Sequence, residues 1–245
     1  MAKLNPVFSG IRVDEGIETA ATVKGVSMKT VLLLGITVLS AFFSLTIGAE
    51  LIYGNMGFYV AVLLGTIFSG VIGQTSPNAA KICSFIYAAC EGALLGLVSF
   101  MFDAYISGIV LTAILITFTI FGVMLFLYTT NIIKVTGRMM KVMTSIAISI
   151  FIVSVVITIT SLINPSNVLI VALYHNPSLM LIVSLFILIY GALMLAIDFE
   201  QVRIIVSNGF DKRYEWMAAL GLMVTIVWIY VQVLRILSIL LRNRK

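Results

Sequence analysis

Residues 142–197 read VMTSIAISIFIVSVVITITSLINPSNVLIVALYHNPSLMLIVSLFILIYGALMLAI, a stretch without any Asp, Glu, Lys or Arg. Three more windows, 30–49, 51–80 and 104–133, also lack these charged residues. A helix needs about 20 apolar residues to cross the hydrocarbon core of a bilayer, and each window is at least that long. The chain of 245 residues is 61% hydrophobic and 10% charged, whereas soluble domains carry about 25% charged residues. The sequence therefore predicts a multispanning membrane protein.

Prolines and charged residues divide these windows into helices. Pro77, Pro165 and Pro177 stand in polar segments, and a proline is costly in most helix interiors. The resulting prediction is an all-α fold, a polytopic membrane bundle of seven transmembrane helices at 28–49, 56–74, 80–102, 105–130, 140–163, 177–200 and 214–240. Residues 168–174 are too few to cross a bilayer and are interpreted as an interfacial turn.

The expected organisation is a polar N-terminal tail (1–27), a transmembrane domain (28–241) and a basic C-terminal tail (242–245). Lys and Arg occur in the N-terminal tail and in the second, fourth and sixth connections, and are absent from the first, third and fifth. Because positive residues are retained on the cytoplasmic side, the N-terminus is predicted to be cytoplasmic. A seventh crossing would place the basic C-terminal tail outside. Either the last helix crosses the membrane regardless of the basic tail that follows it, or it is re-entrant and returns to the cytoplasmic side.

Three acids lie within the predicted spans: Glu91, Asp198 and Glu200. Stranding a charge in hydrocarbon is expensive, so such residues face a partner or water. Glu91 follows Lys81 by ten residues and precedes Asp103 by twelve, which predicts a position near the bilayer midplane. Two interpretations of Glu91 stay open, a protonated carboxyl bonded to a neighbouring helix and a cation or proton site. Next to it, the GALLG segment at 92–96 has the GxxxG spacing of close helix packing.

Asp198 and Glu200 stand two positions apart, about 200° around a helix, so they cannot face one direction. Asp198 is the deeper of the two and is predicted to face the interior of the bundle, roughly 7 Å inside the cytoplasmic boundary. Glu200 is predicted to extend toward the headgroups or to pair with Arg203.

Several other functions are disfavoured. The formal net charge of +5 comes from scattered loops and a short tail, which is not the pattern of a nucleic-acid-binding protein. Cys83 and Cys90 lie in an apolar stretch, where structural thiols are expected, and His175 has no second metal ligand nearby. No HExxH, paired intramembrane aspartates or glycine-rich phosphate loop is present. The chain is therefore predicted not to be an enzyme and to need no cofactor.

Four segments resemble the Bax inhibitor-1/YccA family, also called the transmembrane Bax inhibitor motif family. They are Ser76-Pro77, YAACEGALLG at 87–96, LAIDFEQV at 195–202 and VLRIL at 233–237. NPVF at 5–8 and YEW at 214–216 look like the bacterial subgroup with a longer N-terminal tail. The resemblance implies seven helices, with the last one surrounded by the other six.

The resemblance also implies a pH-sensitive calcium leak, in which an aspartate of the sixth helix and one of the seventh share a proton. Asp198 matches the first aspartate. The position of the second, ten residues before Arg235, is Thr225 in this chain. A threonine cannot repel a neighbouring carboxylate, so this chain departs from gating by a pair of acids at these two positions. Glu215, Glu200 and Glu91 are the candidates to replace the missing acid.

The first functional hypothesis is an integral protein of the bacterial inner (plasma) membrane that passes cations or protons through the bundle. Asp198, Glu91 and Glu200 form its expected pathway, and Ca²⁺ is expected as a transported ion. The alternative is a non-conducting regulator that binds other membrane proteins, such as a membrane protease. A proton-coupled carrier of another solute is a third hypothesis.

Overall fold

The computed structural model describes residues 20–53, 56–163 and 176–242. The predicted turn at 168–174, His175, most of the N-terminal tail and residues 243–245 lie outside these ranges. Within them the chain forms helices and no strand, apart from one isolated bridge between Ala20 and Asp211. The helices are α1 (Val23–Tyr53), α2 (Met56–Thr75), α3 (Ala80–Tyr105), α4 (Ile109–Thr129), α5 (Gly137–Ile163), α7 (Pro177–Ser207) and α8 (Tyr214–Arg242). The predicted all-α class is confirmed.

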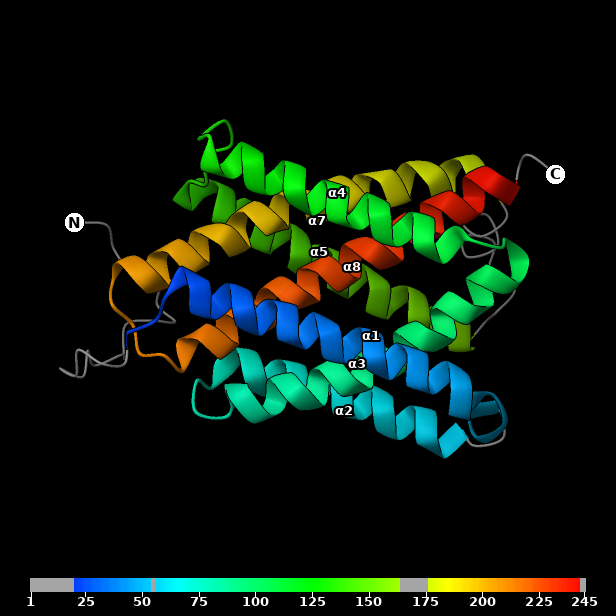
Figure 1. Ribbon diagram of the computed structural model, residues 1–245. Helices are drawn as coiled ribbons and strands as arrows, with labels where there is room; N and C mark the ends of the chain where they lie inside the picture. The colour runs from blue at the N-terminus through cyan, green and yellow to red at the C-terminus, as the bar shows by residue number, and fades with distance from the viewer. Residues whose placement is uncertain (1–19, 54–55, 164–175, 243–245) are drawn as a thin grey trace.

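The helices run side by side and alternate in direction along the chain (Figure 1). Six of them carry an apolar stretch long enough to cross a membrane, and the apolar part of α2 is shorter, Val60–Thr75. With 20 residues, α2 as a whole is about 30 Å long, close to the thickness of a hydrocarbon core. The molecule is therefore a multi-pass membrane bundle.

The helix boundaries follow local signals, with two corrections to the predicted ends. Pro177 opens α7, and the Asn176 side chain accepts a hydrogen bond from the Leu179 N–H at 3.2 Å, as expected for a capped helix start. However, α1 begins at Val23 rather than at residue 28, and α7 continues to Ser207 rather than ending at 200. Charged residues ended the predicted spans, but Arg203 stays helical because its side chain pairs with Glu200 one turn earlier.

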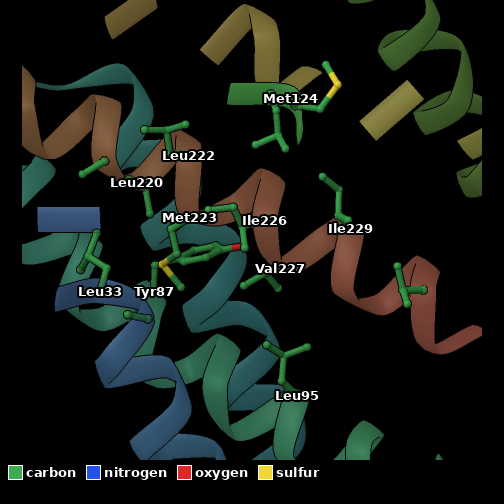
Figure 2. Packing of buried hydrophobic residues seen from close by; sticks show 14 of the residues in the cluster. Leu33, Tyr87, Leu95, Met124, Leu220, Leu222, Met223, Ile226, Val227 and Ile229 are labelled. Atoms are coloured by element: carbon green, nitrogen blue, oxygen red, sulfur yellow. The ribbon is translucent and has the colours of Figure 1, made fainter. Parts of the chain in front are cut away.

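Helix α8 occupies the centre of the bundle. It packs against α1, α2, α3, α4 and α7, whereas α5 is attached to the bundle chiefly through α7. Figure 2 shows the buried apolar residues of α8 that meet the other helices: Leu220, Leu222, Met223, Ile226, Val227 and Ile229. The central position implied by the family resemblance is confirmed.

The same helix decides between the two alternatives for the C-terminal segment. Helix α8 is unbroken over 29 residues, about 43 Å, and its two ends lie at opposite ends of the bundle (Figure 1). A re-entrant segment would turn back within the bundle. The structure therefore favours a full crossing.

Helices α1 and α3 approach closely where the GxxxG spacing predicts it. A Cβ atom at Gly96 would fall 2.5 Å from the backbone carbonyl oxygen of Ala41, and one at Gly92 would collide with the backbone of Thr37. Such contact between backbones requires glycine. The predicted packing role of Gly92 and Gly96 is confirmed.

Large apolar side chains cover the outside of the bundle. Leu39, Phe68 and Phe151 are 70%, 61% and 69% exposed, respectively. In water this surface would promote aggregation, whereas in a bilayer it meets acyl chains.

Candidate functional site

Asp198 is an acid in the interior of the bundle. It lies on α7 between Ile197 and Phe199, which are also buried, and only 8% of the residue is exposed. Its Oδ2 atom is buried and has no hydrogen-bond partner among the described residues. An ionised carboxylate in such a place is costly unless a proton or a cation neutralises it.

Thr225 of α8 faces this carboxyl group. The threonine is itself 8% exposed, and its hydroxyl lies near the Asp198 carboxyl group. The hydroxyl is 3.2 Å from the Gly221 carbonyl oxygen, one turn earlier on α8, and donates its proton there. The residue opposite Asp198 on the central helix is thus neutral.

Glu200 lies on a different face of α7 and has several partners. Its carboxylate accepts hydrogen bonds from the Tyr128 hydroxyl at 2.7 Å and from the Arg203 guanidinium at 2.8 and 2.5 Å. The side chain is mostly buried, with 12% exposed. Glu200 therefore joins α4 to the end of α7 and does not meet Asp198.

Glu91 is partly buried on α3, next to Tyr87. Within the described residues it makes no hydrogen bond or ion pair. Two contacts fix its level along α8: the Ser84 hydroxyl lies 3.5 Å from the Trp216 carbonyl oxygen, and the Ser99 and Tyr230 hydroxyls lie 2.8 Å apart. These pairs are separated by 132 and 131 residues in sequence, so the same register sets Glu91 at the level of Leu222 and Met223.

Glu91 and Asp198 are consequently at similar depths, on α3 and α7, two helices that both pack against α8. Met223 contacts Thr37 of α1 through its sulfur atom at 3.9 Å, whereas Thr225 faces α7. Residues two apart on a helix point about 200° away from each other. The structure therefore does not bring Glu91 and Asp198 into one cluster.

The remaining acid of interest, Glu215, is fully buried at the start of α8. It pairs with Lys29 of α1 and accepts hydrogen bonds from the Thr22 N–H at 2.8 Å and the Thr22 hydroxyl at 3.1 Å. The Lys29 ammonium also lies 5.2 Å from the centre of the Trp216 ring. Glu215 is ten residues from Thr225, about 15 Å along the helix, so it does not replace the missing acid of the pair.

The prediction from sequence missed two of these features. Lys29 and Glu215 are 186 residues apart, and only the fold brings them together. Gln232 on α8 is 5% exposed, and its Oε1 atom is the other buried side-chain oxygen without a partner in the described part of the chain. The signal in the sequence was a polar residue, Gln232, in the middle of an apolar helix. It indicates a buried polar group only when that helix is known to lie at the centre of the bundle.

The described residues contain no group of three His, Cys, Asp or Glu side chains that would hold a metal ion. Cys83 and Cys90 are free and partly buried. Both face α2, where Gly73 and Gly65 leave room for them. Their packing against α2 is that of structural thiols.

These features define a class, a polytopic α-helical membrane protein with an unpaired acid beside its central helix. The family model described as Bax inhibitor 1 like matches residues 5–242, nearly the whole chain. The chain belongs to this Bax inhibitor 1-like family. A search of curated proteins finds no match.

Proposed function

We propose that the protein is a pH-sensitive cation leak pathway in which Asp198 is the responsive carboxylate and Ca²⁺ is the transported ion. The observation that carries the proposal is the Oδ2 atom of Asp198, which has no partner in the described part of the chain and belongs to a residue only 8% exposed. Such a carboxyl is stable in the interior when a proton or a cation occupies it. A proton and a metal ion then compete for the same oxygen atoms, which makes transport depend on pH.

The chemistry of the two facing residues suits a hard cation. The Asp198 carboxylate and the Thr225 hydroxyl both offer oxygen atoms, the ligand type that Ca²⁺ prefers. Ca²⁺ takes about six to eight oxygen ligands, so water must supply most of them. A weak, largely hydrated site of this kind fits conduction better than storage, because a transported ion must also leave.

Glu91 is proposed as a separate site in the same bundle. It is partly buried, at about the depth of Asp198, on the α3 side of the central helix. Glu200 holds a structural position instead, because Tyr128 and Arg203 occupy its carboxylate.

The proposed location is the bacterial inner membrane, with the N-terminus in the cytoplasm. The connections that carry Lys and Arg gather at the end of the bundle where α1 begins (Figure 1). Short basic connections are retained in the cytoplasm, which supports this orientation.

The test is Ca²⁺ entry into proteoliposomes, measured over a range of pH. Wild-type protein should admit Ca²⁺ with a rate that depends on pH, and Asp198→Asn should lose most of that dependence. Asp211→Asn is the matched control, because Asp211 lies in the connection between α7 and α8 and pairs with Arg213. Equal rates and equal pH profiles for wild type and Asp198→Asn would contradict the proposal.

A second candidate, a non-conducting regulator of other membrane proteins, is supported by α5. This helix packs chiefly against α7, so its exposed residues, such as Phe151 at 69% and Ile148 at 55%, are open to lipid or to another membrane protein. Crosslinking in native membranes discriminates between the two. A stoichiometric protein partner on α5, together with no Ca²⁺ entry into liposomes, would favour the regulator.

A further inference from the structure

We infer that the side-chain carbonyl of Gln232 is a second ligand for the cation in the same pathway. Gln232 lies farther than Asp198 from the basic end of the bundle. This inference rests on the proposed function and assigns the pathway a further residue that sets ion selectivity.

The first observation is a buried oxygen atom that has no partner among the described residues. Gln232 is 5% exposed, and its neighbours Val233 and Leu234 are 2% and 0% exposed. A buried carbonyl without a hydrogen bond is unfavourable, and an apolar residue of similar size would fit such a place better. Other buried polar groups of the bundle are bonded, for example Ser99 to Tyr230 and Thr37 to the Leu33 carbonyl.

The second observation is that the same property marks Asp198. Across the described ranges, the buried side-chain oxygen and nitrogen atoms without a partner are Asp198 Oδ2 and Gln232 Oε1. One of them already belongs to the proposed pathway. Both oxygens are acceptors, so both suit a cation or the hydrogens of a water molecule, and neither suits an anion.

The third observation is that Gln232 lies on the face of α8 that is turned toward Asp198. Gln232 follows Thr225 by seven residues, which is two helical turns, and so it lies on the same face about 10 Å farther along. The Thr225 face is the one turned toward Asp198 on α7.

Helix α7 stays in contact with this face between the two positions. A Cβ atom at Gly191 of α7 would lie 3.1 Å from the Ile229 side chain and 3.2 Å from Trp228. Because α7 and α8 run in opposite directions, Gly191, seven residues before Asp198 on α7, lies at about the depth of Gln232, seven residues after Thr225 on α8. The seam between α7 and α8 therefore has Asp198 with Thr225 at one depth, and Gln232 about 10 Å farther along, beside the contact of Gly191 with Ile229.

This order suggests how the seam acts on an ion. The carboxylate binds a cation by charge, and the neutral carbonyl of Gln232 receives the ion about 10 Å farther along the seam. A carbonyl oxygen is a hard ligand that serves Ca²⁺ well in proteins. Because it adds no charge, it does not trap the ion, and conduction requires binding that is weak enough to allow release.

The test combines flux with thermal stability. The probes are Ca²⁺ and K⁺ in proteoliposomes, and melting of each purified variant in detergent. Gln232→Met keeps the length of the side chain and removes the carbonyl. We expect it to reduce Ca²⁺ entry at least fivefold and to melt at the same or a higher temperature than wild type, because an unsatisfied oxygen has been removed. Gln232→Glu keeps an oxygen ligand and adds charge. The ratio of the Ca²⁺ entry rate to the K⁺ entry rate should therefore change at least fivefold in this variant.

Tyr230→Phe is the control, since it removes a partly buried hydroxyl that does have a partner, Ser99. It should lower the melting temperature and leave the Ca²⁺ to K⁺ ratio within twofold of wild type. If Gln232→Met conducts like wild type while Asp198→Asn does not, the inference fails and the proposed function stands. If Gln232→Met loses both stability and flux, Gln232 is a structural residue and the inference is wrong. If wild-type protein admits neither ion, the proposed function itself fails.

Discussion

Lys29 of α1 forms an ion pair with Glu215 of α8, and the Glu215 side chain has no exposed surface. Thr22 adds two hydrogen bonds to the same carboxylate, and the Ala21 N–H donates to the Phe210 carbonyl at 2.7 Å. The segment that leads into α1 is thereby tied to the first turn of the central helix. The negative charge at the start of α8 also suits the positive end of the helix dipole.

Removing one partner of this pair should destabilise the protein strongly. For Glu215→Gln or Lys29→Met we expect a loss of about 3–5 kcal/mol, because each leaves the other charge buried and unpaired. The measurement is the unfolding free energy in detergent or bicelles.

The double variant Lys29→Met with Glu215→Leu is the informative comparison. It removes both charges, so it should be more stable than either single variant. A double variant that loses the sum of the two single effects would show that the pair makes no interaction of its own.

Thr225→Asp should change the pH dependence of transport. The new carboxylate would face Asp198, and two carboxylates in contact share a proton because both cannot be charged at low cost. We therefore expect the pH at which Ca²⁺ entry falls by half to move upward by about one unit or more, measured in proteoliposomes.

Thr225→Val separates this effect from packing. It keeps the shape of the threonine and removes its hydroxyl, so the side chain opposite Asp198 no longer carries an oxygen atom. An unchanged pH midpoint in Thr225→Asp would indicate that the two side chains do not meet in the conducting protein.

Gly96→Ala should separate α1 from α3. The added methyl group would fall 2.5 Å from the Ala41 carbonyl oxygen, and a backbone atom cannot move aside as a flexible side chain does. Overpacking of this kind costs about 1–3 kcal/mol. Gly35→Ala is the matched control on α1, because nothing lies within 4 Å of its Cβ position. Thermal melting of both variants measures the difference, and equal melting temperatures would contradict the close approach.

Asp211→Asn should have a small effect that disappears in acid. The Arg213 guanidinium and backbone N–H bond to the Asp211 carboxylate at 2.9 and 2.8 Å, which lowers the pKa of Asp211 below its usual value. The stabilisation is therefore present above the unfolded pKa of about 3.9 and is lost as the pH falls through the lower folded value. Because the pair is partly exposed, we expect about 0.5 kcal/mol or less at pH 7.

The melting temperatures of wild type and Asp211→Asn, compared from pH 7 to pH 3, measure this effect. The gap between them should close toward the acidic end. A gap that widens in acid would mean that the carboxylate is not stabilised in its charged form.

Much of the fold follows from the sequence. Windows without charge, cut by proline, predict the helices α2 to α5 with ends within a few residues of those observed. The errors arose where charge was taken as the end of a span. Arg203 does not end α7, because its side chain reaches Glu200 along the helix surface and its backbone continues in helical geometry.

The functional residues divide in the same way. The two-residue spacing of Asp198 and Glu200 predicts that they face different directions, and the structure has them so. Helical spacing says nothing about partners on other helices. It therefore left open which acid has a partner, and it gave no indication that Lys29 and Glu215 meet.

The chain alone thus establishes a membrane bundle of apolar helices, since the cost of charge in hydrocarbon acts on each segment separately and can be read residue by residue. Which helix lies at the centre, which acids are paired and which buried oxygens are left without a donor depend on contacts between segments far apart in the chain. Those contacts form only when the helices pack, because side-chain hydrogen bonds and ion pairs require specific distances and directions in space.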